Sequence, residues 1–451
     1  MPVDSCHSPA PFRGLQPVSR AELAEGFGAL GVTLFAVTAW STPLGNRIAL
    51  GLCLAALALS PEARAALYRD SFCRYAVMLV VYLVAETLWG ATLFPETLER
   101  QLLDLATLVL LLLGFLAVAW WLQGSLARIN RVLALAALGL WVGLIPHAQL
   151  RDVLTFRTGD QTGFQMSAGC SGLISASVIL GLLLFAEPWL TLSRKPWQIA
   201  LRGLVWAAGL YLSAYMLVAS QSRTAWLAAG ILFPLVFCYR YYRNYRYRGF
   251  SLRQLPYLPV MVVVIFAAGV AANGESIWRR IGPDRETAQK ILQGHDQTLP
   301  YSSLKFRFHA QKFGLNKWLE RPLMGWGTGS SKHLIATSGR PELWVAQARN
   351  WVSHLHNTYL ELLVRFGLLG MVLLSVAVWR LAVAFRAVQR AGCLPSDHVL
   401  LVAGCLGMAA IWGLTVFQLM TEEWRAYWSM VMGVGYTFVL NARPAVAITK
   451  G

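Results

Sequence analysis

The residues best suited to chemistry stand where a long polar segment returns to a hydrophobic one. His356 and Asn357 lie in HLHNTYLELLVRFGLLG, residues 354–370, and Gly367 and Gly370 follow them. An ionisable side chain at a membrane boundary is by default a functional-site hypothesis. A neutral histidine can take a proton from a hydroxyl as a general base, because its ordinary pKa lies near neutrality. The plainer interpretation is that His356 only caps a helix.

Two arginines are candidates for holding an anion. Arg223 follows Ser220-Gln221-Ser222 in a tight connection between two hydrophobic segments, at the first turn of the second one. A helix N-terminus with hydroxyl groups and an arginine is a ready anion site. Arg307 begins the helical stretch FRFHAQKFGLNKWLE, and an arginine that faces a membrane is costly unless it meets an anion. Snorkelling at the interface is the alternative for Arg223.

Four further residues are weaker candidates for contacts with the same substrate, namely Arg157, His354, Asn357 and Arg321. Arg321 lies where the helical stretch breaks, before Pro322 and a glycine-rich turn at 325–329. Such a turn lets the backbone approach another group closely, but its spacing is not that of a phosphate-binding loop.

Neither a metal nor a cofactor is expected. The chain has no CxxC or HExxH spacing typical of a metal site, and no P-loop or GxGxxG sequence. Cys170, in CSG at 170–172, is a possible thiol nucleophile. No neighbouring residue in the sequence would lower its pKa, so we expect it to serve helix packing.

The elements that must position these residues are membrane helices. Of 451 residues, 56% are hydrophobic and 14% are charged, against roughly a quarter charged in a soluble protein. A span takes about 17–25 residues. Twelve segments are candidates, although the second is short: 24–42, 45–60, 73–94, 102–122, 128–147, 165–188, 199–218, 222–239, 255–273, 357–382, 398–420 and 424–441.

The placement of arginine and lysine predicts the orientation. The connections that would lie inside with a cytoplasmic N-terminus are rich in arginine, and five arginines fall between 240 and 253 alone. We therefore expect an all-α, polytopic membrane protein with both termini in the cytoplasm. Its predicted parts are nine spans in 1–273, a large periplasmic loop at 274–356, three spans in 357–441 and a cytoplasmic tail at 442–451.

The net charge of the large predicted loop indicates which kind of ligand it attracts. The segment 274–355 carries twelve Lys and Arg against six Asp and Glu, a net charge of +6. A positive field attracts anionic ligands such as pyrophosphate or lipid headgroups; the alternative is a solvated loop that lies on the headgroups. The basic and aromatic run at 240–253 could bind nucleic acid. Its position beside a span favours membrane lipids instead, so no nucleic-acid partner is expected.

The stretch HNTYLELLVRFGLLG resembles the C-terminal signature of the O-antigen ligase and polymerase superfamily. That signature is His, then Asn, Ser or Gln, then nine residues, Gly, two residues and Gly. The sequences RFHAQKFGLNKWLERPLMGWGTGS and SRTAW are similar to two further motifs of the superfamily. The matches run in the family's order from about 220 to 370. The N-terminal half shows only the general multi-span pattern.

The resemblance implies a GT-C-like, metal-independent glycosyltransferase of the bacterial inner membrane with a periplasmic active site. It would transfer a glycan from undecaprenyl pyrophosphate to a sugar hydroxyl of the lipid A-core and invert the anomeric centre. His356 would be the general base, and Arg223 and Arg307 would hold the pyrophosphate. A polymerase of lipid-linked repeats and a protein O-oligosaccharyltransferase are alternatives within the superfamily.

Two alternatives come from other classes of protein. A transporter or flippase of lipid-linked glycans should show internal repeats and charged residues within its spans. The sequence shows no repeat, and its ionisable residues are expected to cluster at one face. An exosortase-like thiol peptidase is suggested only by the CSG sequence at 170–172.

Overall fold

The computed structural model describes residues 19–158, 160–192, 195–248, 267, 271, 273–294, 299, 302–345 and 350–441. The predicted ninth span, 255–273, lies outside these residues except for three positions, and so does the predicted tail at 442–451. The described chain is helical, as expected. Its exception is a short antiparallel pairing of β1 (Trp344–Val345) with β2 (Asn350–Trp351).

The helices of the N-terminal half are α1 (Arg20–Thr38), α2 (Pro43–Leu59), α3 (Pro61–Arg69), α4 (Ser71–Leu93), η1 (Pro95–Thr97), α5 (Leu98–Leu122), α6 (Leu126–Leu144), α7 (Leu150–Thr155), α8 (Ala168–Leu184), α9 (Ala186–Leu190), α10 (Pro196–Ala219) and α11 (Arg223–Arg248). Those of the C-terminal half are α13 (Gly274–Leu292), α14 (Ser303–Glu320), α15 (Ser330–Ala336), η4 (Pro341–Leu343), α16 (Thr358–Arg390), α17 (Ser396–Gly413) and α18 (Glu422–Asn441).

Eight of the described helices are long and apolar enough to cross a membrane, namely α1, α4, α5, α6, α10, α11, α16 and α17. The helices α2 and α3 meet at an angle of 89° and would make a ninth span if the pair crosses as one. The apolar helix α8 has only 17 residues. The chain is thus a multi-pass membrane protein, and the number twelve stays a prediction.

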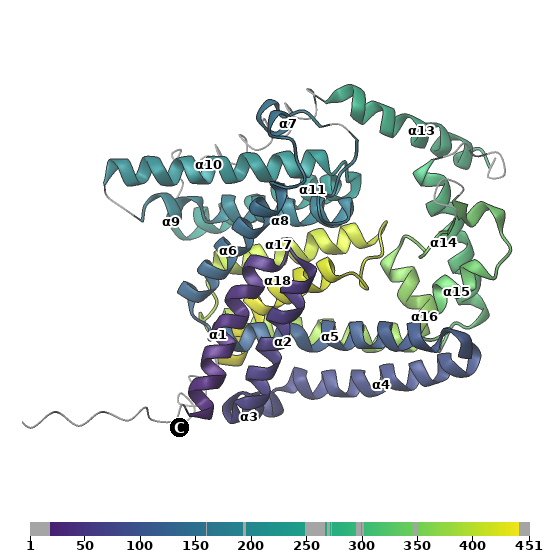
Figure 1. Ribbon diagram of the computed structural model, residues 1–451, viewed down its shortest axis with the longest axis horizontal. Helices are drawn as coiled ribbons and strands as arrows, with labels where there is room; N and C mark the ends of the chain where they lie inside the picture. Colours follow the sequence, from purple (N-terminus) through teal and green to yellow (C-terminus); the bar gives the residue numbers. More distant parts are fainter. Residues whose placement is uncertain are drawn as a thin grey trace, which may run out of the picture.

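The helices pack as a bundle with a separate cap at one end. In Figure 1, the cap consists of α14 and α15, which lie beside the ends of α4 and α5 and the start of α16, and of α13, which runs above α14. Within the bundle, α5 packs on α18 and α4, while α11 packs on α17 and α8. A second apolar cluster lies in the cap and includes Phe313 of α14 together with Leu355 and Val364. The cap therefore has its own core, which extends onto the first turns of α16.

Helix α16 is broken at Gly367, whose backbone angles are φ 59° and ψ −165°. The turn after α14, residues 322–327, fills the break. It donates two backbone hydrogen bonds to carbonyls before Gly367 and accepts two from N–H groups after it, over 2.8–3.1 Å. A side chain on Gly367 would press into the carbonyl of Leu323, and a Cβ on Gly325 would lie 2.6 Å from the Arg365 carbonyl. The two glycines let this turn dock into the helix.

Candidate active site

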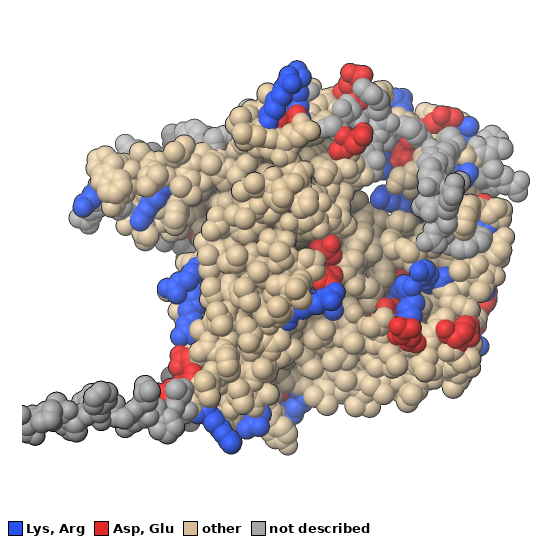
Figure 2. All heavy atoms as spheres, viewed as in Figure 1, with Lys and Arg blue, Asp and Glu red and all other residues tan. Residues whose placement is uncertain are grey.

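A hollow separates the cap from the bundle. Figure 2 shows few charged side chains over the long helices, whereas Lys, Arg, Asp and Glu gather around a hollow between α11 and the cap helices α13 and α14. In Figure 1, the connection between α17 and α18 points toward this place. The predicted histidines lie on the segment that enters α16 beside it.

His354 and His356 form a pair at this turn. Their ring centroids are 4.2 Å apart, and the backbone N–H of His356 donates to Nδ1 of His354 over 3.2 Å. The bonded Nδ1 must be unprotonated, so a neutral His354 carries its proton on Nε2. The backbone of His356 is left-handed, with φ 54°, which few residues other than glycine adopt. The turn is therefore held in a defined, strained shape.

Burial keeps both imidazoles neutral. Burial, the largest cause, together with the neighbouring His354 and Arg307, lowers the pKa of His356 from 6.5 to about 3. Burial also lowers the pKa of His354, where Glu361 acts in the opposite direction and Arg365 and Arg307 add to the lowering. A neutral His356 has a lone pair available for a proton, as a general base requires.

Arg307 lies on α14, which packs against the histidine turn. The side chain of Gln311 on the same helix donates to the His356 carbonyl over 3.4 Å. Arg307 is partly buried, and its charge reaches both histidines, as their lowered pKa values indicate. The structure thus brings Arg307 and the two histidines together.

Arg223 opens α11 on the opposite side of the hollow. It is ion-paired with Asp284 of α13, and the other oxygen of Asp284 accepts the backbone N–H of Leu304, in α14, over 3.2 Å. The next residue, Thr224, bonds through its hydroxyl to Thr415 in the connection before α18. Arg223 is therefore joined to the helix that carries Arg307 through one carboxylate.

The remaining predicted residues have other contacts. Asn357 is the N-cap of α16, and its side-chain oxygen accepts from the N–H groups of Tyr359 and Leu360 at 3.0 and 3.1 Å. Capping is thus the work of Asn357 and not of His356. Arg321 ends α14 and stacks 4.4 Å above the ring of Trp326. Arg157 is exposed. None of these contacts joins Arg157 or Arg321 to the histidine pair.

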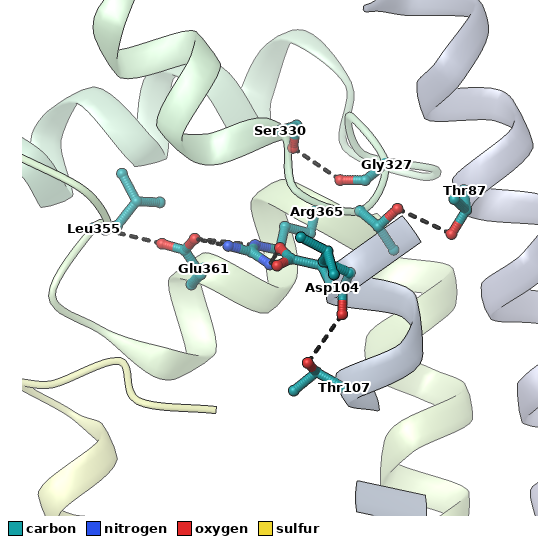
Figure 3. Close-up of polar contacts among 10 residues, drawn as sticks. Thr87, Asp104, Thr107, Gly327, Ser330, Leu355, Glu361 and Arg365 are labelled. Atoms are coloured by element: carbon teal, nitrogen blue, oxygen red, sulfur yellow. Dashed lines mark hydrogen bonds and ion pairs between the residues drawn. The ribbon is translucent and has the colours of Figure 1, made fainter. Parts of the chain in front are cut away.

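The sequence reasoning missed a buried charge cluster, drawn in Figure 3. Arg365 of α16 donates to Glu361 one turn earlier, at 2.8 and 3.0 Å, and to Asp104 of α5, at 2.8 Å. Arg365 is 2% exposed and Glu361 is fully buried. These three ionisable residues lie within helices that are long and apolar enough to span, in the first turns of α16 and α5. The available signal was Glu and Arg four residues apart within a hydrophobic stretch, since that spacing places them on one helix face.

Metal and thiol chemistry find no support in the described part of the chain. Among the described residues, no group of three or more His, Cys, Asp and Glu is placed to hold a metal ion. Cys170 is buried in α8, where it packs in the core of the bundle.

The comparison with known proteins supports one family. No curated protein matches the chain. Residues 207–375, less than half of the chain, match the family model described as O-antigen ligase. That segment contains Arg223, Arg307 and the histidine turn, and it agrees with the span of the resemblance in the sequence. Through this segment, the chain is similar to the O-antigen ligase family.

Proposed function

We propose that this protein transfers a glycan from undecaprenyl pyrophosphate to a sugar hydroxyl of the lipid A-core, with inversion at the anomeric carbon. The similarity of residues 207–375 to the O-antigen ligase family supports glycosyl transfer of the ligase or polymerase type. The observation that carries the proposed chemistry is the neutral His356, with Arg307 on the neighbouring helix. A base and a cation at one site suit a reaction that removes a proton and expels an anion.

In the proposed reaction, the acceptor oxygen attacks C1 of the donor sugar from the face opposite the lipid pyrophosphate. The bond between C1 and the pyrophosphate oxygen breaks, and its electron pair leaves with the phosphate. The hydroxyl proton passes to a ring nitrogen of His356, which is neutral before the step. The negative charge that develops on the leaving group is stabilised by guanidinium groups, which stay protonated and bind phosphate oxygens in pairs.

Arg307 and Arg223 are the proposed pyrophosphate ligands. Arg307 is near the histidines, whereas Arg223 is ion-paired with Asp284. Donor binding would place phosphate oxygens where this carboxylate now lies, so that Arg223 exchanges one anion for another. Because Asp284 also accepts from Leu304, its release would loosen the start of α14 as the donor enters. Asn357, His354, Arg321 and Arg157 are kept as weaker candidates for substrate contacts.

We further propose that the cap faces the periplasm and that both termini are cytoplasmic. The arginine-rich end of α11 supports this orientation, because such clusters favour the cytoplasmic side. The lipid-linked donor and the lipid A-core would then both reach the hollow from the outer leaflet of the inner membrane.

The direct test is transfer by the purified protein in detergent or liposomes, with extracted lipid-linked glycan and lipid A-core as substrates. The expected product is lipid A-core that carries the glycan, seen by gel mobility and mass spectrometry, without added metal. A deletion strain separates the alternatives. Loss of all long-chain lipopolysaccharide with accumulation of lipid-linked polymer indicates a ligase, and core plus a single repeat indicates a polymerase. Accumulation of lipid-linked glycan on the cytoplasmic side of the membrane would favour a transporter.

A further inference from the structure

The buried cluster of Arg365, Glu361 and Asp104 has a cation between two carboxylates. Arg365, Glu361 and Asp104 are, as whole residues, 2%, 0% and 7% exposed. Figure 3 shows Arg365 reaching between Glu361, on its own helix, and Asp104, on α5. The guanidinium also lies 4.8 Å from the ring of Phe417, in the connection between α17 and α18. One side chain therefore contacts three separate parts of the molecule.

Such a cluster is not an efficient means of stabilising helix packing. Removing charged groups from water costs several kcal/mol per ion, and apolar residues of the same volume often stabilise a fold as well or better. Ionisable groups inside membrane proteins are accordingly rare and usually functional. The contacts of this cluster indicate what its function is.

The cluster is connected to the histidine turn from two sides. The second oxygen of Glu361, which does not bind Arg365, accepts the backbone N–H of Leu355 over 2.8 Å. Leu355 immediately precedes His356, the residue with left-handed backbone angles. On the other side, the Phe417 ring beneath Arg365 lies 5.9 Å from the ring of His354. A strained backbone persists only where its surroundings fix it. The hydrogen bond from the Leu355 N–H to Glu361 fixes the backbone one residue before His356.

We propose that Glu361 and Arg365 are positioning residues for the general base, which they hold at the acceptor hydroxyl by fixing the Leu355–His356 peptide. Asp104 fixes Arg365 to α5. This inference rests on the proposed function. Neither Glu361 nor Arg365 is expected to contact the substrate, because both side chains are buried and already bonded to protein groups. Their effect is transmitted through the backbone of the turn.

The inference predicts a separation of turnover from donor binding. In Glu361→Gln the side chain keeps its shape, but its amide group cannot satisfy both Arg365 and the Leu355 N–H. The imidazole then shifts, and a displacement of about 1 Å at a catalytic group can cost about 100-fold. We expect kcat to fall by about 10- to 100-fold, while KM for the lipid-linked donor stays within about twofold, because the proposed pyrophosphate ligands are untouched.

Arg365→Gln should reproduce the loss, and the double variant should cost little more than the worse single one. Residues that act as one unit are not additive, whereas independent contributions multiply in rate. Asp397→Asn is the matched control. It breaks the pairs of Asp397 with Arg240 and Arg243, at 3.3 and 3.5 Å, at the far end of α11, and it should leave kcat unchanged.

Several results would overturn the inference. One is normal kcat in folded Glu361→Gln, and another is a raised donor KM with normal kcat, which would make the cluster part of the binding site. Should both charge variants fail to fold, Asp104→Asn decides, because it removes only the anchor on α5. It should lower kcat, and wild-type turnover in that variant refutes the idea. Failure of the proposed function is distinct, since wild-type protein would then transfer no glycan and replacing His356 would change nothing.

Discussion

At the scale of single residues, the protonation of His356 decides between two roles. An imidazolium could hold the pyrophosphate by charge, whereas only a neutral ring can remove the acceptor proton. Burial with Arg307 and His354 nearby lowers the pKa of His356 to about 3, so the ring is neutral before substrate binds. The anionic donor raises this pKa again, since an opposite charge favours the protonated form. The donor would thus prepare the base for its proton.

Replacement of His356 tests this role directly. In His356→Gln, turnover should fall about 10²- to 10⁴-fold, the usual contribution of a general base, while donor binding persists. Turnover and donor affinity are measured on the purified variant. His333→Gln is the control, because His333 pairs with Glu96 on the surface of the cap at 3.2 Å and should tolerate the change. Near-wild-type turnover of His356→Gln would leave the histidine with a structural role only.

The rate should also depend on pH in a defined way. The profile of kcat/KM reports the free enzyme, in which the pKa of His356 is about 3. The neutral fraction is therefore complete from about pH 5 upward, and kcat/KM should not fall because of His356 between about pH 8 and pH 5. A fall centred near the ordinary histidine pKa would show that the ring is solvated. A rise on acidification would favour the imidazolium role.

The free energy of unfolding should depend on pH through His354 and His356. The folded pKa values of His354 and His356 lie below 6.5, so the unfolded chain binds more protons as the pH falls through this range. The stability contributed by the neutral rings is complete above about pH 6.5 and is lost toward pH 3. Thermal unfolding in detergent should show Tm falling between about pH 7 and pH 4.5. The loss should be smaller in the double variant His354→Gln/His356→Gln, and an equal loss there would contradict the assignment.

At the scale of elements, the break in α16 joins the cap to the bundle. The turn at 322–327 completes the hydrogen bonds that the helix loses at Gly367, and Gly327 continues the contact onto α4, where its Cβ would lie 2.6 Å from Gly90. The motif of histidine followed by spaced glycines therefore describes one structural unit. It consists of a strained turn, a capped helix start and a break into which the cap docks.

Gly367→Ala tests this unit. Its positive φ costs a residue with a Cβ about 1–3 kcal/mol, and the added methyl also meets the Leu323 carbonyl. We expect a clear fall in Tm together with loss of transfer. Gly230→Ala is the control within α11, because a methyl group added there would have nothing within 4 Å and alanine is the better helix former. Equal Tm values for the two variants would show that the break is not needed.

Whether a feature of the fold or the site could be predicted from the sequence depends on how far apart its residues lie along the chain. Helix α14 and its end at Arg321 follow from local aromatic spacing and the following proline and glycines, so both were expected. The pair of Arg365 with Asp104 joins residues 261 positions apart, and that of Arg223 with Asp284 joins residues 61 apart. No local pattern encodes such partners, because tertiary packing chooses them. The left-handed backbone of His356 could not be predicted from the spacing of residues either.

At the scale of the whole molecule, the bundle and the cap contribute different parts of the candidate site. The bundle supplies the membrane anchorage and one wall, through α11, and the cap supplies the other wall, through α14. Charged groups gather where the two meet, and the long helices are largely uncharged in the face shown in Figure 2. The chemistry thus depends on which side of the membrane the cap occupies, because donor and acceptor must both reach it.

A labelling experiment tests which side of the membrane the cap occupies. In a background without native cysteines, a membrane-impermeant thiol reagent applied to intact spheroplasts should label cap positions and spare the opposite ends of α11 and α16. The exposed positions chosen are Arg285→Cys and Arg340→Cys in the cap, and Tyr245→Cys and Arg390→Cys at the opposite ends. The arginine-rich end of α11 should be protected, since such clusters stay on the cytoplasmic side. Permeabilised cells should label all four thiols, which shows that each is reactive. Labelling of position 245 in intact spheroplasts would reverse the orientation, and a periplasmic site built on Arg223, Arg307 and His356 would then be excluded.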